Sequence, residues 1–226
     1  MEEENMKRTP KRILSLLLCA AMLFSLMPMM AFAEEPVAKI GEDYFTDIQA
    51  ALNAWDAGET LTLLADVTTS TTKKVTVTRN SGDWTLDLGD HTWTTNNCNA
   101  IQLFATGGTP IEMNHGLVIN ANANGGINAG SKYVVEYKND SDVGKIGDDR
   151  GYRPFLKING GTYTGKYIHY YTTITWSTTP TGAATTIDKG ADGSVPVING
   201  GLALGKCIAN FNAGIYNGDI NVYGVT

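Results

Sequence analysis

The side chains of this sequence best suited to binding chemistry are aromatic, and a group of them lies in the second half of the chain. They are Tyr163, Tyr167, Tyr170, Tyr171 and Trp176. Exposed rings have flat apolar faces that can stack on sugar rings. Strand alternation predicts that Tyr167, His169 and Tyr171 face one side and that Tyr170 faces the other. Tyr167, His169, Tyr171 and Trp176 are therefore candidate glycan ligands; alternatively, the rings fill the core and cover the outside.

A second candidate site is a cation site at Asp140 and Asp142. Calcium requires oxygen ligands at alternating positions, which these two aspartates provide. The segment departs from an EF-hand loop, because Gly144 and Lys145 stand where Asp or Asn and then Gly are required, and no Glu closes the loop. Asp140 and Asp142 are thus candidate calcium ligands, and no other cofactor is expected.

Other residues with catalytic or metal-binding potential are scattered. The histidines, His91, His115 and His169, show no metal-ligand spacing, and no G-x-S-x-G, P-loop or H-E-x-x-H motif occurs. Cys98 and Cys207 lack the C-x-x-C spacing of a metal site. In an exported protein they could pair or remain buried thiols, and the sequence leaves both open.

Residues 1–33 have the features of a secretory signal peptide rather than of a folded segment. Four basic residues precede the apolar stretch 13–26, and Ala31-Phe32-Ala33 is a cleavage signal. We therefore predict a secreted, extracellular protein, either free or associated with the cell wall.

The charge of the chain limits the choice of partner. Removing residues 1–33 takes away four basic and three acidic residues, so the formal net charge of −6 becomes −7. Nucleic acids and anionic membranes prefer basic surfaces, and no other apolar run reaches membrane-spanning length. A polysaccharide or a cell-surface glycan is the partner that we expect.

The elements that would position these residues begin with one helix, predicted over residues 46–57. Ile48, Ala51, Leu52 and Trp55 recur at helical spacing. Thr46 and Gln49 form a capping box, and Gly58 would end the helix. We expect residues 34–58 to form a strand and a helix that caps the strands of residues 59–226; the alternative is an ordinary packing helix of an α+β fold.

After Gly58 the sequence predicts short strands, and one pattern recurs among them. N-G-G-x-x-x-G begins at Asn124, Asn159 and Asn199, with offsets of 35 and 40 residues. Asn-Gly tolerates positive φ, so each copy predicts a sharp corner with hydrogen-bonded asparagine ladders between coils. Repeats of this size favour a solenoid of stacked coils, although chance turns in a glycine-rich β protein would also produce them. We expect residues 139–153 and 178–194 to be projecting loops.

Residues 38–94 resemble the start of many secreted, repeat-bearing bacterial surface proteins. The resemblance is carried by Ile40-Gly41, Tyr44-Phe45-Thr46, the helix, Gly58-Glu59-Thr60-Leu61-Thr62-Leu63-Leu64 and Leu86-Asp87-Leu88-Gly89. The Ile-Asn-Gly-Gly coils at Ile158 and Ile198 resemble the same group. That group has the fold of the pectate-lyase-like superfamily. The resemblance implies an all-β, right-handed parallel β-helix with a short N-terminal capping helix.

The resemblance also implies where catalytic residues would lie. Pectate lyases of this fold bind calcium with a carboxylate cluster and use an arginine base, roles that Asp148, Asp149 and Arg150 would fill here. The alternative for these charges is a plain solvated loop. The superfamily contains adhesins as well as enzymes, so fold cannot choose between them. Our first hypothesis is a non-enzymatic, adhesin-like or glycan-binding protein; the alternative is a calcium-dependent polysaccharide lyase or glycoside hydrolase.

The strand pattern continues to the end of the sequence. Residues 217–224 still read as part of a coil, and no capping helix follows them. An uncapped coil exposes strand edges. We therefore expect that the coils of residues 59–226 are truncated at the C-terminal end and that the chain is a fragment of a longer protein; the alternative is a partner on the last coil, as in end-to-end self-association.

Overall fold

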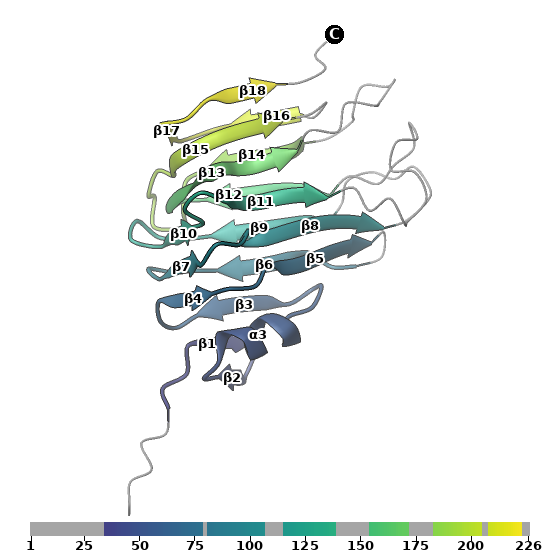
Figure 1. Ribbon diagram of the computed structural model, residues 1–226, viewed down its shortest axis with the longest axis vertical. Coiled ribbons are helices and arrows are strands. Elements are labelled where there is room, and N and C mark those ends of the chain that lie inside the picture. Colours follow the sequence, from purple (N-terminus) through teal and green to yellow (C-terminus); the bar gives the residue numbers. More distant parts are fainter. Residues whose placement is uncertain are drawn as a thin grey trace, which may run out of the picture. The chain divides into compact units, whose positions relative to one another are not determined.

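The computed structural model describes residues 34–78, 81–106, 115–138, 154–171, 183–204 and 208–222. The predicted signal peptide lies outside these ranges. Residues 36–226 form one compact unit, which is described here by itself. Apart from one helix, the described residues of this unit are all-β, and nearly all their strand pairs are parallel, as predicted (Figure 1).

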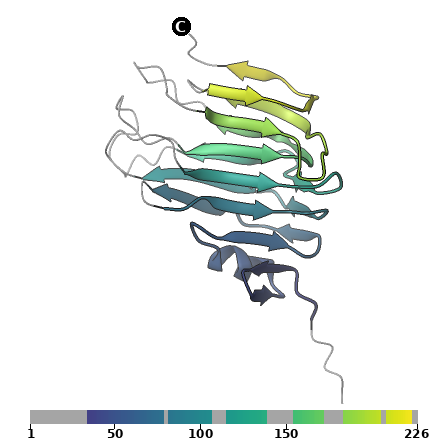
Figure 2. The ribbon, with the colours of Figure 1, turned by 180° about the vertical axis from the view of Figure 1, so that it is seen from behind.

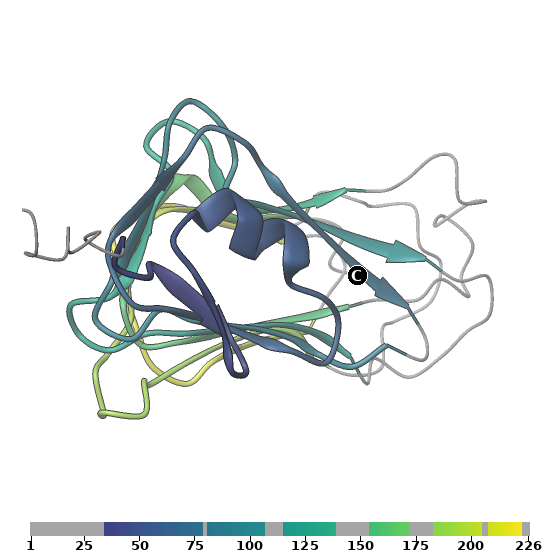
Figure 3. The same ribbon diagram turned by 90° about the horizontal axis from the view of Figure 1, so that it is seen from below.

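The unit begins with a small antiparallel arrangement. Strand β1 (Ala38–Ile40) pairs antiparallel with β2 (Asp43–Phe45) on one side and with β3 (Thr60–Leu63) on the other. Helix α3 (Ile48–Ala54) connects β2 to β3 and lies across the end of the two sheets (Figure 3). This end of the stack is therefore covered by the chain itself.

The remaining strands form two sheets. The first has the order β16-β14-β12-β9-β6-β3-β1-β2. Its further members are β6 (Trp84–Asp87), β9 (Gly116–Asn120), β12 (Phe155–Asn159), β14 (Ala183–Asp188) and β16 (Ile208–Phe211). The second sheet has the order β4-β7-β10-β13-β11-β8-β5, and β15 pairs with β13, β17 and β18.

The strands of the second sheet differ in length. They are β4 (Val67–Thr69), β5 (Lys73–Thr78), β7 (Thr92–Thr95), β8 (Ile101–Thr106), β10 (Gly126–Asn128), β11 (Tyr133–Lys138), β13 (Thr162–Tyr171), β15 (Val197–Leu204), β17 (Ile215–Tyr216) and β18 (Ile220–Val222). Both β10 and β11 pair with β13, and both β17 and β18 pair with β15. Each long strand, β13 or β15, thus lies alongside two successive short strands of a neighbouring coil.

The chain passes alternately through the two sheets, so each strand stacks on an earlier one in order along the unit (Figure 2). One inward column shows this register. Leu61 pairs with Leu86, Leu86 with Ile119, Ile119 with Ile158 and Ile158 with Ile187, and all five side chains are fully buried. The core is a set of such apolar columns between the sheets.

The helix differs from its prediction at both ends. It spans only Ile48–Ala54, and its N-cap is Asp47, whose carboxylate accepts hydrogen bonds from the backbone N–H groups of Gln49 and Ala50. The predicted Thr46 cap was wrong, because an aspartate one residue later satisfies the same free donors. The apolar face was right: Ala51, Leu52 and Trp55 are buried.

The N-G-G pattern is not the structural repeat. Gly126 pairs with Thr162, so the first two copies stack one residue out of register, and Thr164 pairs with Asn199, so the third copy is displaced by five residues. The copy at Asn159 has positive φ at both glycines of its N-G-G. The first copy lies at the turn between β9 and β10 without positive φ at Gly125 or Gly126, and the third copy lies within β15. The predicted offsets of 35 and 40 residues therefore did not give the register.

Close backbone approach explains most of these glycines instead. A Cβ atom on Gly125 would lie 2.1 Å from the carbonyl oxygen of Gly89, and one on Gly161 would lie 2.9 Å from that of Gly125. A second column consists of Gly165, Gly200 and Gly218. We call these the glycine columns; they allow successive coils to touch backbone to backbone.

The asparagine ladders that we predicted are present, although their partners come from outside the pattern. The Asn159 side chain donates to that of Asn120, and Asn217 donates to Asn199, each at 2.8 Å. The predicted loop at 178–194 was wrong in part, because β14 lies within it. Its threonines suit a strand, but the glycines and alanines around them obscured the signal. The predicted loop at 139–153 lies outside the described residues.

We predict that Gly125→Ala lowers the free energy of unfolding by about 3 kcal/mol, because the new methyl group meets an immobile carbonyl. The control is Gly41→Ala, where φ is positive, at +56°, unlike that of Gly125, but no atom lies within 4 Å of the added Cβ. It should cost about 1 kcal/mol. Urea denaturation measures both. Equal losses would show that close approach does not constrain the corner.

Candidate functional site

The structure describes only part of the predicted site. Asp140, Asp142, Asp148, Asp149, Arg150 and Trp176 lie outside the described residues. Tyr171 ends β13, but its side chain is not described. Tyr167 and His169 are both in β13, where they occupy quite different surroundings.

The predicted alternation along β13 was wrong. Ile168 and His169 are both buried, at 0% and 3% exposure, whereas Tyr167 and Tyr170 are half-buried. The register between β13 and β15 shifts between Tyr167 and His169, as at a β-bulge. Two consecutive residues thereby turn inward, and the tyrosines on either side of them remain accessible.

A neighbouring strand repeats this arrangement. Tyr133 of β11 pairs with Tyr167, and Glu136 of β11 pairs with Tyr170. Between them Val134 and Val135 are both fully buried, as Ile168 and His169 are in β13. Residues at matching positions of two adjacent coils thus place three tyrosines together.

We call Tyr133, Tyr167 and Tyr170 the tyrosine cluster. The rings of Tyr133 and Tyr170 are stacked, with centroids 4.7 Å apart and an interplanar angle of 15°. The Tyr167 ring lies 5.7 Å from that of Tyr133 and 5.0 Å from that of Tyr170. All three residues are half-buried, so the cluster is packed and still in contact with solvent.

Polar side chains lie beside the rings. The Glu136 carboxylate accepts hydrogen bonds from the side-chain amides of Asn99 and Gln102, each at 2.8 Å. The Lys166 ammonium lies 6.0 Å from the centre of the Tyr167 ring. The surface therefore combines aromatic faces with hydrogen-bonding groups held on adjacent strands.

Sequence reasoning missed Tyr133 because it grouped aromatic residues along the chain and not across coils. A signal was present. Lys132-Tyr133-Val134 and Lys166-Tyr167-Ile168 have the same pattern of residue types, and Tyr133 and Tyr167 are partners in adjacent strands.

His169 is a core residue, with 3% of its surface exposed. Its Nδ1 atom lies 2.9 Å from the Thr185 hydroxyl, and burial lowers the pKa of the ring to about 4. A buried imidazolium would be poorly solvated, so the ring is neutral at physiological pH. A ring buried in this way offers no open face for stacking on a sugar.

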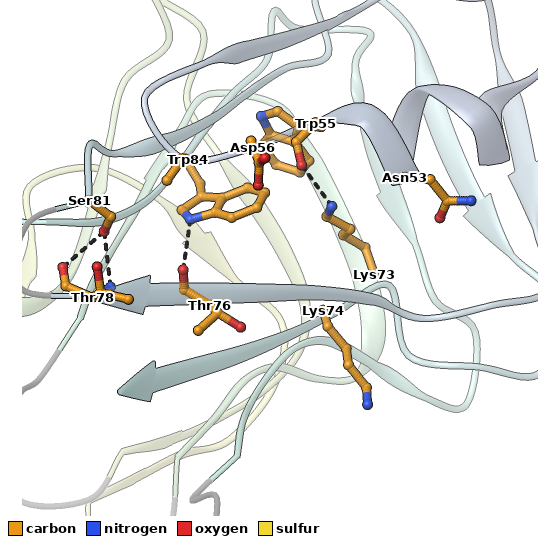
Figure 4. A pocket seen from close by; sticks show the side chains of 10 residues that line it. Asn53, Trp55, Asp56, Lys73, Lys74, Thr76, Thr78, Ser81 and Trp84 are labelled. Carbon is orange, nitrogen blue, oxygen red and sulfur yellow. Dashed lines mark hydrogen bonds between the residues drawn. The ribbon is translucent and has the colours of Figure 1, made fainter. Parts of the chain in front are cut away.

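A hollow of about 430 Å³ lies where the helix meets the first coils, and it was not predicted (Figure 4). Its lining includes Lys73, Lys74, Asp56, Trp55 and Trp84. The indole N–H of Trp84 donates to the carbonyl oxygen of Thr76. The rings of Trp55 and Trp84 meet edge to face, with centroids 5.2 Å apart, and are almost fully buried.

Lys73 joins the helix to the second sheet in this hollow. Its ammonium donates to the backbone carbonyls of Leu52 and Trp55 at the C-terminal end of α3 and lies 4.8 Å from the centre of the Trp84 ring. Burial lowers the pKa of Lys73, and the charge of Asp56 partly opposes this. A cation at these carbonyls suits the helix dipole, so Lys73 holds the helix in place.

No group of three His, Cys, Asp or Glu side chains suited to a metal ion occurs in the described part of the chain. Within the same residues, no helix has the length and apolarity needed to cross a membrane. The Cys98 thiol lies 3.9 Å from the carbonyl oxygen of Thr69, and Cys207 is outside the described ranges.

Comparison of the chain with protein-family models, with curated proteins and with solved structures gave no match. The tyrosine cluster is therefore the candidate site on its geometry alone.

We predict that Lys73→Met lowers the free energy of unfolding by about 1–3 kcal/mol, because two helix carbonyls lose a charged donor. Lys74→Met is the matched control, since Lys74 is the exposed neighbour in the same hollow. It should change stability by less than about 0.5 kcal/mol. Urea midpoints measure both variants, and equal effects would contradict the assigned role of Lys73.

We also predict that His169 makes stability depend on pH. Its folded pKa of about 4 is below the ordinary value of 6.5. Between these values the unfolded chain binds the proton more readily, so stability falls as pH falls from 6.5 towards 4. The His169 contribution from pH 7.5 to pH 5 is about 2 kcal/mol.

Urea denaturation at the two pH values tests this prediction with His169→Gln, which stays neutral throughout. This variant should lose most of the dependence, whereas the partly exposed His91→Gln should keep it. An unchanged pH slope in His169→Gln would contradict the assignment.

Proposed function

We propose that this chain is a secreted or cell-surface β-helix protein that binds glycans through the tyrosine cluster and is not an enzyme. The observation that carries the proposal is the packing of three half-buried tyrosine rings from two adjacent coils. Rings fixed by their neighbours lose little conformational freedom when a ligand binds. Sugar rings, which have apolar faces and hydroxyl edges, match such a surface.

The polar groups beside the cluster complement this surface. Glu136, Asn99 and Gln102 offer a carboxylate and two amides, which can hydrogen-bond sugar hydroxyls. Their hydrogen bonds to one another hold these groups in place before a ligand arrives. We therefore expect the bound glycan to have hydroxyl groups along one edge of its sugar rings, where they can reach these side chains.

For the fold we propose a right-handed parallel β-helix of the pectate-lyase-like superfamily. The in-register columns of residues and the passage of the chain between two parallel sheets support this assignment. The signal-peptide features of residues 1–33 support an extracellular location. The enzymatic alternative rests on Asp148, Asp149 and Arg150, and no described residue adds to it.

Native gel electrophoresis through gels that each contain one soluble polysaccharide tests the binding proposal. Suitable probes are polygalacturonate, xylan, mannan, a β-glucan and mucin. We expect at least one of them to retard the protein. Tyr133→Ala with Tyr170→Ala should weaken this binding by about tenfold or more, equivalent to about 1.4 kcal/mol.

The matched control is Tyr44→Ala, because Tyr44 is a single tyrosine, 61% exposed, on β2 at the other end of the unit. It should bind as the parent does. Circular dichroism checks that each variant is folded. Absence of retardation with every probe, or equal retardation of the double variant, would overturn the proposal.

A further inference from the structure

The side-chain arrangement of the tyrosine cluster continues into a third coil. In β13 and β11 two outward residues flank two buried ones, as described above. Asn99 and Gln102 flank the fully buried Ala100 and Ile101 in the same way, and both flanking residues are half-buried. Gln102 pairs with Glu136 of β11. Three adjacent coils therefore present outward pairs with the same spacing.

A fourth coil adds a cation to this surface. Lys74 of β5 pairs with Gln102, and its side chain leaves the strand in the direction opposite to that of Lys73 (Figure 4). Lys74 is exposed, and no hydrogen bond or ion pair within the described residues engages its ammonium, which lies 5.9 Å from the centre of the Phe104 ring. Four outward residues on successive strands thus form a row, which we call the outward column: Lys74, Gln102, Glu136 and Tyr170.

The polar part of this surface lies on one side of the tyrosine cluster only. On the other side, Tyr167 pairs with Gly201 and Tyr170 pairs with Ala203. A Cβ atom on Gly201 would lie 2.7 Å from the Tyr167 ring, so this ring packs over the glycine. Neither partner has a side chain that can hydrogen-bond. A ligand that leaves the rings finds polar contacts towards β5 and not towards β15.

The outward column also has hydrogen-bonding capacity left for a ligand. One N–H of the Gln102 amide donates to Glu136, and its other N–H and its oxygen have no partner among the described residues. The Lys74 ammonium has three N–H donors. Sugar hydroxyls both donate and accept, so they suit these groups.

On the basis of the glycan binding proposed above, on which this inference rests, we propose that the ligand is a linear polysaccharide lying along the stack, across the strands. One sugar lies over each of the four strands β13, β11, β8 and β5. Adjacent strands are about 4.8 Å apart, so the outward column spans about 14 Å. An extended chain of pyranose rings advances by a distance similar to one strand spacing with each sugar, so successive sugars meet successive coils.

Each member of the outward column then has a defined role. The first sugar stacks on Tyr170, the next two receive hydrogen bonds from or donate them to Glu136 and Gln102, and the fourth accepts one from Lys74. A chain lying along β13 instead would contact the tyrosines of that strand and would not reach Gln102 or Lys74. The length of the ligand therefore distinguishes the two directions.

Isothermal titration calorimetry of the protein with oligosaccharides of increasing length tests this inference. Suitable probes are the cello-, xylo-, manno- and galacturono-oligosaccharides from disaccharide to hexasaccharide. We expect the dissociation constant to fall by about tenfold or more from disaccharide to tetrasaccharide and by less than about twofold beyond it, because four coils contribute. Equal affinity at every length would overturn the inference and leave glycan binding by the tyrosine cluster intact. Absence of binding in all four series would overturn both.

Variants separate the outward column from the rings. Lys74→Met with Gln102→Ala should weaken tetrasaccharide binding by about fivefold or more and change disaccharide binding by less than about twofold. The matched control is Lys157→Met, because Lys157 is also an exposed strand lysine beside a phenylalanine ring, 4.6 Å from that of Phe155, but belongs to the first sheet. It should bind as the parent does. A folded double variant that binds the tetrasaccharide as tightly as this control would contradict the inference.

Nuclear magnetic resonance of the parent protein provides a readout that needs no variant. Saturating tetrasaccharide should shift the side-chain amide signals of Asn99 and Gln102, because a sugar lies over that coil. Movement of the tyrosine ring signals without these amide shifts would place the ligand on the cluster alone and overturn the inference.

Discussion

The close contact of backbones at the glycine columns is the constraint on which the rest of the structure depends. Strands in neighbouring coils lie about 4.8 Å apart, and the corners can follow that spacing only if no side chain intervenes. At Gly125 and Gly200 a Cβ atom would lie 2.1 and 2.2 Å from a carbonyl oxygen of the preceding coil. With the corners held at this distance, the strands between them pair in register, and residues of similar type stack into columns.

One inward column of paired residues contains side chains of different chemistry along the unit. It runs through Lys73, Ile101, Val135, His169, Leu202 and Ile220. At its start the Lys73 ammonium reaches the helix carbonyls, which an apolar residue could not satisfy. In its middle His169 is accommodated because Thr185 lies within hydrogen-bonding distance. At its end Ile220 repeats the chemistry of the core at a surface.

Sequence reasoning predicted what depends on local pattern and missed what depends on register. The all-β class and the apolar face of the helix follow from the periodicity of apolar residues within each element, whereas the parallel pairing was what the resemblance to the pectate-lyase-like superfamily implied. The N-G-G pattern was misleading because its glycines are required for two different reasons. Gly160 and Gly161 adopt positive φ, whereas Gly125 and Gly200 allow close approach of two backbones. The sequence does not distinguish these two reasons for a glycine. Two inward residues in succession, as at Ile168 and His169, break the alternation on which face predictions depend.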